Sequence, residues 1–415
     1  MKKKILSLGV IAVLIVMLIS LTGCGEKESS NNQNNVVTNE SEVSNQISKE
    51  EMQKLEVEKV YATSENYAVV RGKDLKIYII DKEGIVQGTV NDAISTTVFM
   101  INKNGYVSQV SNNNSKVLDK TGKVIFESSG TEYYKYGITP DGYLLKRTTE
   151  SDFETGSSEK WSVIDINGNI VHELSGEVVQ NHMRAYSINY LGGNIFSIGG
   201  FISGMGNLEQ YLLNAKTGEI KKAEVEIGIS DFSTREDKDY VKHSIELDNG
   251  MIVVNESVLI KEDLTCVEFN NKIAINEKYY YDEDAKTICN YDGTVAKEIT
   301  EGDGITNIYY ADDKYYVSSG TKYYYVMDNN FEQIKEPIKL GKSVNAINKY
   351  GVIVNKDVTT RQSALYDFEG NLLYDFNNYY AYDPQDFVAR TFIDSVSNDT
   401  MPVNLNTGEV LTIYK

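Results

Sequence analysis

The feature that most constrains the fold is a four-residue turn that recurs along the chain between two short apolar runs. In residues 364–376, an apolar run that ends at Tyr366 leads into Asp367-Phe-Glu-Gly370, and a second apolar run continues to Phe376. Asp at the first position and Gly at the fourth favour a type I turn, and the flanking runs have the length and composition of strands. The segment therefore predicts a β-hairpin.

Counting this hairpin, nine copies of the turn are recognisable, some of them degenerate. The other eight are Asp81-Lys-Glu-Gly84, Asp119-Lys-Thr-Gly122, Asp165-Ile-Asn-Gly168, Asn214-Ala-Lys-Thr-Gly-Glu219, Lys261-Glu-Asp-Leu264, Tyr291-Asp-Gly-Thr294, Asp328-Asn-Asn-Phe331 and Asn404-Leu-Asn-Thr-Gly-Glu409. Successive copies lie 30 to 49 residues apart, and two more short strand-like runs precede each hairpin. A four-stranded unit of this size cannot bury both faces alone, so the copies must pack against one another.

Radial closure leaves few free strand edges, so the repeats predict an all-β fold, a β-propeller of four-stranded antiparallel blades. The interval of only 30 residues between positions 262 and 292 suggests that two copies share or lose strands. We therefore expect eight blades, with seven and nine as the alternatives. In the next-to-last repeat the strands are expected at 344–348, 351–355, 364–368 and 372–376.

Two further expectations follow from the repeat pattern. Residues 410–414 should form the outer strand of the last blade and pack against the first blade near 67–80. The longer intervals between turns predict loops at 148–160 and 191–207, and loops on a rigid scaffold often carry binding residues.

The turns Asn214-Ala-Lys-Thr-Gly-Glu219 and Asn404-Leu-Asn-Thr-Gly-Glu409 resemble the strand-turn signature of PQQ-like and WD40-like β-propeller repeats. The resemblance covers roughly residues 56–415 and implies the propeller fold. Blades of the PQQ type usually carry a Trp four residues after the turn Gly, where this chain has Lys222 and Thr412. This departure argues against a quinone-dependent enzyme, and we expect no cofactor.

The start of the chain has the features of an export signal. Three lysines precede an apolar run from Ile5 to Ile19, and the run ends in Leu21-Thr-Gly-Cys24. This ending resembles the lipobox of bacterial lipoproteins, which implies that Cys24 is acylated and becomes the first residue after cleavage. An uncleaved membrane anchor is the alternative, because residues 5–23 are long enough to span a bilayer.

These features divide the chain into a signal peptide at 1–23, a tether at 24–51 and the propeller at 52–415. The tether is rich in Ser, Asn, Gln and Glu, with too few apolar residues to order it. We therefore expect a palmitate-type lipid anchor in the cell membrane, with the propeller at the cell surface on the extracytoplasmic side.

The charge of the chain disfavours nucleic acid as a partner. Its formal net charge is −19, and removal of three signal lysines makes it −22. Such a field repels phosphate, although solubility outside the cell explains it as well. Beyond Cys24 only Cys266 and Cys289 remain. Two free, buried thiols are the expectation, and one disulfide is the alternative.

Motifs for catalysis and for metal binding are not found in the sequence. The three histidines, His172, His182 and His243, have no ligand spacing, and there is no G-x-S-x-G segment. Asp165-Ile-Asn-Gly168 lacks the Glu that a calcium loop of the EF-hand type needs, so we predict no metal site. Runs of tyrosine in the second half of the propeller are interpreted mainly as packing between blades.

The two predicted loops supply the candidate ligand-binding residues. The first loop is acidic and the second is bordered by aromatic residues, a combination that suits a polar ligand with an apolar side. The candidates are Glu150, Asp152, Glu154, Tyr190, Phe196 and Phe201. The sequence thus favours a non-enzymatic binding lipoprotein for a protein or glycan ligand. The alternative is a glycan-processing hydrolase or lyase with acidic residues at the propeller channel.

Overall fold

The computed structural model describes the chain from Ser48 onward, with gaps. The described residues are 48–93, 97–111, 114–129, 137–152, 156–175, 188–202, 206–225, 227, 244–247, 250–254, 257–299, 305–318, 323–340, 343–357, 362–376, 380–381, 386–392 and 401–415. The chain divides into two units, Met1–Ser48 and Lys49–Lys415. The signal peptide and Cys24 lie outside the described residues. In the part that is described, no helix reaches the length and apolarity that a membrane crossing requires.

The described residues of the second unit form nine antiparallel sheets, numbered here in chain order. The first sheet contains β36 (Thr412–Tyr414), β1 (Lys54–Thr63), β2 (Tyr67–Gly72), β3 (Ile77–Asp81) and β4 (Val86–Val90). The second contains β5 (Val98–Ile101), β6 (Val107–Ser111), β7 (Asn114–Leu118) and β8 (Val124–Ser129). The third contains β9 (Leu144–Asp152), β10 (Gly156–Ile164) and β11 (Ile170–Leu174), and the fourth β12 (Ile188–Gly192), β13 (Ile195–Ile202), β14 (Gly206–Asn214) and β15 (Ile220–Lys222).

The remaining five sheets each contain four strands. The fifth contains β16 (Ser244–Glu246), β17 (Ile252–Val254), β18 (Val258–Ile260) and β19 (Cys266–Glu268), and the sixth β20 (Lys272–Ala274), β21 (Tyr279–Asp282), β22 (Thr287–Asn290) and β23 (Val295–Glu298). The seventh contains β24 (Asn307–Ala311), β25 (Lys314–Ser318), β26 (Tyr323–Met327) and β27 (Ile338–Lys339). The eighth contains β28 (Ser343–Asn348), β29 (Gly351–Asp357), β30 (Gln362–Tyr366) and β31 (Leu372–Asp375), and the ninth β32 (Tyr380–Ala381), β33 (Val388–Phe392), β34 (Met401–Asn404) and β35 (Glu409–Val410).

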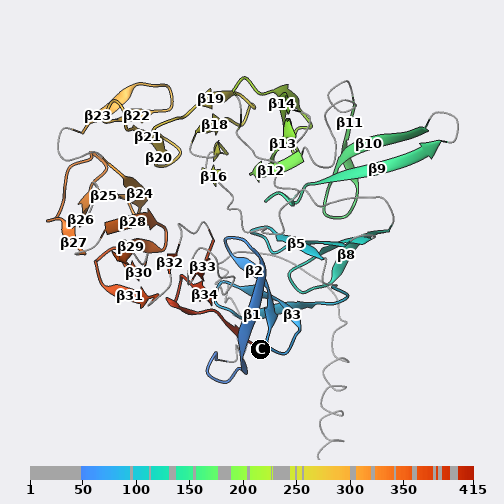
Figure 1. The fold of residues 1–415 in the computed structure, drawn as a ribbon, viewed down its shortest axis with the longest axis horizontal. Coiled ribbons are helices and arrows are strands. Elements are labelled where there is room, and N and C mark those ends of the chain that lie inside the picture. The colour runs from blue at the N-terminus through green and yellow to red at the C-terminus, as the bar shows by residue number, and fades with distance from the viewer. Residues whose placement is uncertain are drawn as a thin grey trace, which may run out of the picture. The chain divides into compact units, whose positions relative to one another are not determined.

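The nine sheets follow one another around a ring, as Figure 1 shows. Nine clusters of buried apolar side chains fill the spaces between neighbouring sheets. One of them joins Ala68 and Val70 of the first sheet to Phe387 and Val388, at the start of β33 in the ninth. Because the last sheet packs on the first, the ring is closed, and the predicted propeller fold is confirmed.

This packing explains the apolar content of the middle strands. Every residue of β17 and β18 is buried, because both faces of the sheet meet a neighbouring sheet. The outermost strands are more exposed, with Ile170 at 55 % and Val295 at 57 %. The middle strands are therefore continuous runs of Val, Ile and Leu. Strands with one solvated face show instead an alternation of apolar and polar residues.

The outer hairpins have the predicted turn geometry. In the third sheet, Oδ1 of Asp165 accepts hydrogen bonds from the amides of Asn167 (2.8 Å) and Asn169 (2.9 Å). The amide of Gly168 donates to the Asp165 carbonyl at 3.0 Å, and Gly168 has φ of +83°. A Cβ at Gly168 would lie 2.3 Å from the ring of Phe126 on β8, so the turn also leans on the outer strand of the preceding sheet.

A similar contact joins the first outer turn to β36, the last strand of the chain. A Cβ at Gly84 would lie 2.3 Å from the Thr412 carbonyl, and the amide of Tyr414 donates to the Gly84 carbonyl at 2.9 Å. The predicted outer strand at 410–414 is therefore corrected. Only β35 pairs within the ninth sheet, whereas β36 pairs antiparallel with the beginning of β1.

The predicted number of eight blades is lower than the nine sheets that the described residues form. The reason lies in the short interval between positions 262 and 292. No strand is lost there: β19 and β20 have only three residues each and β21 and β22 only four, so the full number of strands fits into the short repeat.

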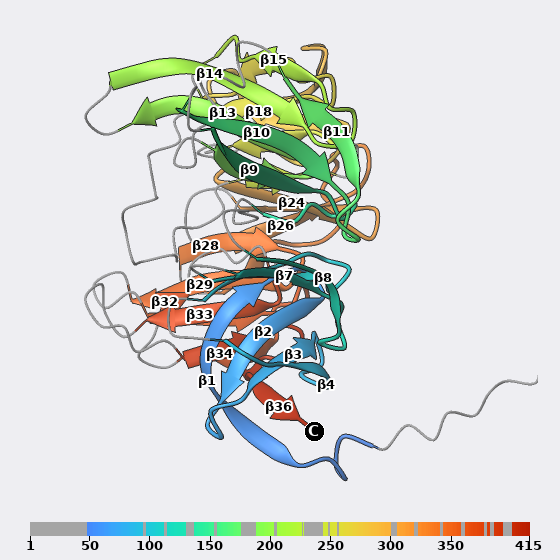
Figure 2. The same ribbon diagram turned by 90° about the vertical axis from the view of Figure 1, so that its right-hand side faces the viewer.

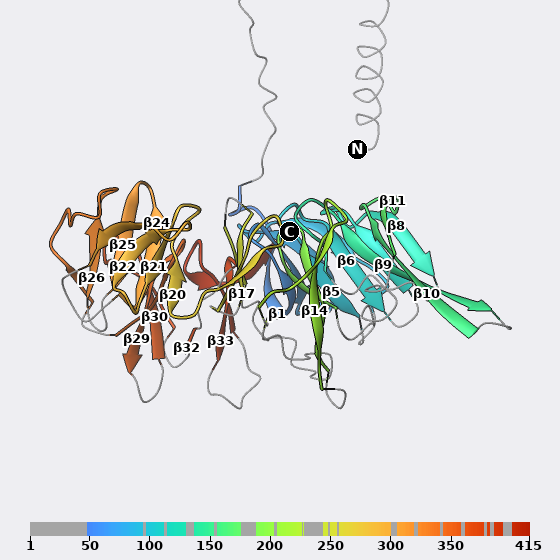
Figure 3. The same ribbon diagram turned by 90° about the horizontal axis from the view of Figure 1, so that it is seen from above.

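The predicted loops at 148–160 and 191–207 are also corrected, because both are largely strand. β9 and β10 pair over nine positions, and β13 pairs with β14 out to Ile202 and Gly206. Figure 2 shows the β13–β14 hairpin projecting from the ring, and Figure 3 shows the β9–β10 hairpin doing so. The extra residues lengthen two hairpins instead of forming irregular loops.

Candidate functional site

The described turns between the first and second strands of the four- and five-stranded sheets lie at the inner edge of the ring, and in the third sheet the turn 139–142 before β9 takes this place. We call them the inner turns. In the second sheet, Oδ1 of Asn102 accepts from the amides of Asn104 (3.1 Å) and Tyr106 (3.0 Å). In the eighth sheet, Oδ1 of Asn348 accepts from the amide of Tyr350 at 3.0 Å. These side-chain acceptors fix the inner turns in the same way as Asp fixes the outer turns.

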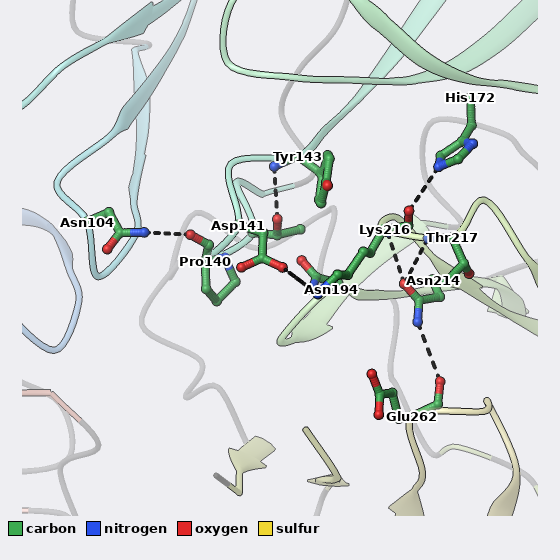
Figure 4. A network of polar contacts seen from close by, with 11 residues as sticks. Asn104, Pro140, Asp141, Tyr143, His172, Asn194, Asn214, Lys216, Thr217 and Glu262 are labelled. Atoms are coloured by element: carbon green, nitrogen blue, oxygen red, sulfur yellow. Dashed lines mark hydrogen bonds and ion pairs between the residues drawn. The ribbon is translucent and has the colours of Figure 1, made fainter. Parts of the chain in front are cut away.

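Neighbouring inner turns are joined by hydrogen bonds in which side chains take part. The bonds run from Thr63 Oγ1 to Asp386 Oδ2 (2.7 Å), Asn66 Nδ2 to the Lys103 carbonyl (3.1 Å), Asn102 Nδ2 to the Thr139 carbonyl (2.8 Å), Asn194 Nδ2 to Asp141 Oδ2 (2.9 Å) and the Gly193 amide to Glu246 Oε2 (3.1 Å). Figure 4 shows the part of this network around Pro140 and Asp141. These bonds hold the turns in fixed positions around the centre of the ring.

The inner turns and inner strands enclose a cavity of about 1060 Å³ at the centre of the ring. Its described lining comes from all nine sheets and the turns within them. The sixth and seventh sheets contribute the longest continuous segments, residues 270–277 and 306–310. We call this space the central cavity. It reaches the upper end of the volumes typical of ligand pockets.

One sector of the central cavity brings charged groups together from three sheets. Glu65 of the first sheet and Lys349 of the eighth form an ion pair at 3.6 Å. Asp386, which precedes β33 of the ninth sheet, accepts the hydrogen bond from Thr63. Burial, and after it the charges of Asp386 and Glu65, raise the pKa of Tyr350 above its usual value. The Tyr350 hydroxyl therefore stays protonated at neutral pH.

The neighbouring sector of the wall, formed by the sixth and seventh sheets, is aromatic and amide-rich. The ring of Tyr309 stacks on Phe368 with centroids 6.0 Å apart and planes 10° apart. The hydroxyl of Tyr310 donates to Asp313 Oδ1 at 3.0 Å. Asn270 is exposed at the approach to β20 and lines the cavity. The rings are thus held in place by the protein itself.

The predicted ligand-binding residues are only partly brought together. Tyr190 lines the central cavity, donates to the Gly193 carbonyl at 3.1 Å, and has its pKa raised mainly by burial. Its ring packs on Phe196, which is fully buried and belongs to the core between the third and fourth sheets. Phe196 therefore has no surface to offer a ligand.

The other predicted residues belong to the two projecting hairpins or lie outside the described residues. Glu150 and Asp152 lie on β9, and Phe201 lies on β13. Glu154 and Cys24 are outside the described residues. The hairpins belong to neighbouring sheets, as expected, and they are strands of the scaffold rather than loops.

The remaining sequence candidates have structural roles. Cys266 and Cys289 are free and buried, as expected, and burial raises the pKa of the Cys266 thiol, which keeps it protonated. A ring nitrogen of His172 lies 3.0 Å from the Lys216 carbonyl of the next sheet (Figure 4). His182 and His243 are outside the described residues. Among the residues that are described, no His, Cys, Asp or Glu group is arranged to hold a metal ion.

The sequence reasoning missed the inner turns, although the sequence carries a signal for them. Several repeats hold a second four-residue turn upstream of the outer one. Examples are Asn102-Lys-Asn-Gly105, Thr139-Pro-Asp-Gly142 and Asn348-Lys-Tyr-Gly351. Gly105 and Gly142 have φ of +82° and +85°, as the fourth position of such a turn requires. Searching for paired turns would have predicted the inner edge of the ring.

No known family model matches the sequence, and no curated protein matches it. Solved structures do share similarity with the chain. A eukaryotic initiation factor structure has 12 % identity and a TM-score of 0.44, covering 87 % of this chain and 96 % of its own. BamB from Moraxella catarrhalis has 12 % identity and a TM-score of 0.28 over 63 % and 80 %, and AztD from Citrobacter koseri has 12 % and 0.30 over 69 % and 88 %. These TM-scores are too low to support a conclusion about this chain. The fold assignment depends on the sheets and apolar clusters of the chain itself.

Proposed function

We propose that the protein is a lipid-anchored binding protein on the extracytoplasmic side of the membrane, whose propeller holds a protein or glycan ligand without catalysing a reaction. The observation that carries this proposal is the central cavity, because all nine sheets contribute to its lining and hydrogen bonds fix its rim. A rigid, concave and polar site is suited to ligand binding. The two projecting hairpins add a second surface for a large partner.

The anchoring part of the proposal is supported by Leu21-Thr-Gly-Cys24 and by the polar tether. We expect Cys24→Ala to abolish lipid attachment, since the thiol is the acyl acceptor. Metabolic labelling with a fatty-acid probe measures this directly, and Cys266→Ala, which removes a buried thiol, serves as the control. Equal labelling of wild type and Cys24→Ala would show that the anchor is not at this cysteine.

The binding part of the proposal is tested by shortening one hairpin. Thr148 and Lys160 are direct partners in the β9–β10 ladder, so residues 149–159 can be replaced by a Gly-Ser turn without disturbing the rest of the sheet. We expect this variant to melt like wild type and to capture less of a protein partner from cell-envelope extracts. Undiminished capture of every ligand would exclude this hairpin from the binding surface.

One observation favours a second candidate function, a glycan-processing hydrolase or lyase. Five carboxylates from four sheets line the central cavity: Glu65, Glu246, Glu277, Glu283 and Asp386. Such chemistry requires a pair of carboxylates about 5 to 10 Å apart that flank the scissile bond. Incubation with cell-wall glycans, followed by detection of new reducing ends or unsaturated products, separates the two functions. Products that disappear in Glu65→Gln or Asp386→Asn would favour the enzyme.

A further inference from the structure

The chemistry of the central cavity narrows the class of ligand. Its described lining contains five carboxylates and three lysines, so that at neutral pH it has an excess of two negative charges. An anionic ligand would be repelled by the negative charge of the cavity and by the net negative charge of the whole protein. Phosphate, nucleic acid and other polyanions are therefore unsuited to the site.

Several of the charged groups are already engaged within the protein. Glu65 pairs with Lys349, and Lys272 pairs with Asp282 at 3.7 Å. Asp386 accepts from Thr63, and Glu246 accepts from the Gly193 amide. A cationic ligand would have to displace protein contacts to reach these carboxylates. Five of the eight charged groups in the described lining are thus engaged within the protein.

The uncharged lining includes amides, hydroxyls and tyrosines beside aliphatic side chains such as Ile273 and Ile308. Asn270 and Thr306 are exposed in the cavity wall, and Asn307 lies beside them. Tyr309 and Tyr310 are half-buried and also line the cavity, but their rings pack on opposite faces of the seventh sheet, towards the eighth and the sixth sheet respectively. Amide and hydroxyl groups exchange hydrogen bonds with a polyhydroxylated molecule, and tyrosine adds apolar area with a polar tip.

We propose that the central cavity binds an uncharged oligosaccharide segment, held by amide and hydroxyl groups of the sixth and seventh sheets. This inference rests on the proposed binding function and assigns the glycan to the cavity rather than to the projecting hairpins. Because recognition is through neutral hydrogen bonds, the affinity changes less than about twofold between about 0.05 and about 0.5 M NaCl.

The test fills the cavity without touching the core. Asn270→Trp places a large ring at an exposed lining position, and Asn406→Trp makes the same change in an exposed outer turn of the ninth sheet. Both variants are first compared with wild type by thermal melting. Binding is then measured calorimetrically with neutral N-acetylglucosamine and glucose oligomers, cationic glucosamine oligomers and anionic polygalacturonate.

We expect wild type and Asn406→Trp to bind a neutral oligomer alike, and Asn270→Trp to bind it at least about tenfold more weakly, since a blocked site loses several hydrogen bonds. Equal binding by the two tryptophan variants overturns the inference, as does a preference for the cationic or anionic probe. If no neutral oligomer binds while hairpin-dependent capture of a protein partner persists, the glycan site is refuted and the proposed binding function stands. If neither is observed, both are refuted.

Discussion

At the scale of the residue, the turn glycines combine a conformational and a packing requirement. Gly122 has φ of +82°, and a Cβ there would lie 2.1 Å from the Thr89 carbonyl oxygen of the preceding sheet. Gly293 has nearly the same φ, +86°, but no atom lies within 4 Å of its Cβ position. The two positions therefore separate the cost of a left-handed backbone from the cost of forcing neighbouring sheets apart.

We expect Gly122→Ala to lower the free energy of unfolding by about 3 kcal/mol, because it adds overpacking against a backbone oxygen to the conformational strain. Gly293→Ala should lower the free energy of unfolding by only about 1 kcal/mol, because it introduces only the strain of the left-handed conformation. Urea denaturation of the two variants measures the difference. Equal shifts in midpoint would mean that the contact between sheets contributes nothing at Gly122.

At the same scale, an ion pair and a hydrogen bond join the residue after β36 to the turn between β2 and β3. Nζ of Lys415 lies 2.9 Å from Asp74 Oδ2, and the Tyr78 hydroxyl donates to the same oxygen at 2.6 Å. The hydrogen bonds from Tyr78 and Lys415 lower the pKa of Asp74 to about 2. The ionised carboxylate is thus favoured in the folded protein.

This lowered pKa gives stability that is fully present above the unfolded value of about 3.9 and is lost as the pH falls towards about 2. Asp74→Asn should therefore destabilise the protein at pH 7 by about 1 kcal/mol or less, because the group is partly solvated. The difference from wild type should shrink below pH 4 and vanish as the pH falls below about 2. Urea midpoints across this range measure it, and a difference that does not change with pH would contradict the assignment.

At the scale of the element, the outer hairpins could be predicted because their information is local. In the eighth sheet, all four expected strands lie within two residues of β28 to β31. Asp367 accepts from the amides of Glu369 (2.9 Å) and Asn371 (2.8 Å), and Gly370 has φ of +86°. Both features are dictated by residues four or fewer positions away, so they can be read from the sequence.

Features that depend on distant partners could not be read in this way. A polar segment such as 148–160 is compatible with a loop or with a long ladder, and only pairing across the hairpin decides between them. The three-residue strands of the fifth and sixth sheets carry too short a pattern to be counted from the sequence. Both errors come from strand length rather than from strand position.

The candidate site was less predictable than the fold for the same reason. The tyrosine runs were interpreted mainly as packing between blades, and Tyr281, Tyr316 and Tyr324 are buried in such clusters. The central cavity, in contrast, joins Glu65 to Lys349, which are 284 residues apart in the chain. No local sequence pattern predicts that these two residues are neighbours, because they come together only after nine sheets have closed into a ring.

At the scale of the whole molecule, closure depends on contacts between the first and last parts of the second unit. Lys54, Leu55 and Glu56 of β1 pair with Tyr414, Ile413 and Thr412 of β36. Asn404 Nδ2 donates to the Lys82 carbonyl at 2.7 Å, joining the last outer turn to the first. A ring whose sheets contact only their neighbours is stabilised cooperatively when this last interface is made.

Removal of residues 412–415 tests this dependence, because it deletes β36 and leaves β35 in the ninth sheet. The deletion takes away three ladder pairs and the fully buried Ile413, so we expect a loss of about 5 kcal/mol and a broadened or split thermal transition. The variant with residues 149–159 replaced is the control, since this hairpin belongs to the third sheet and the seam is formed by β1 and β36. Calorimetry distinguishes the outcomes: an unchanged single transition after removal of β36 would mean that the ring holds together without this seam.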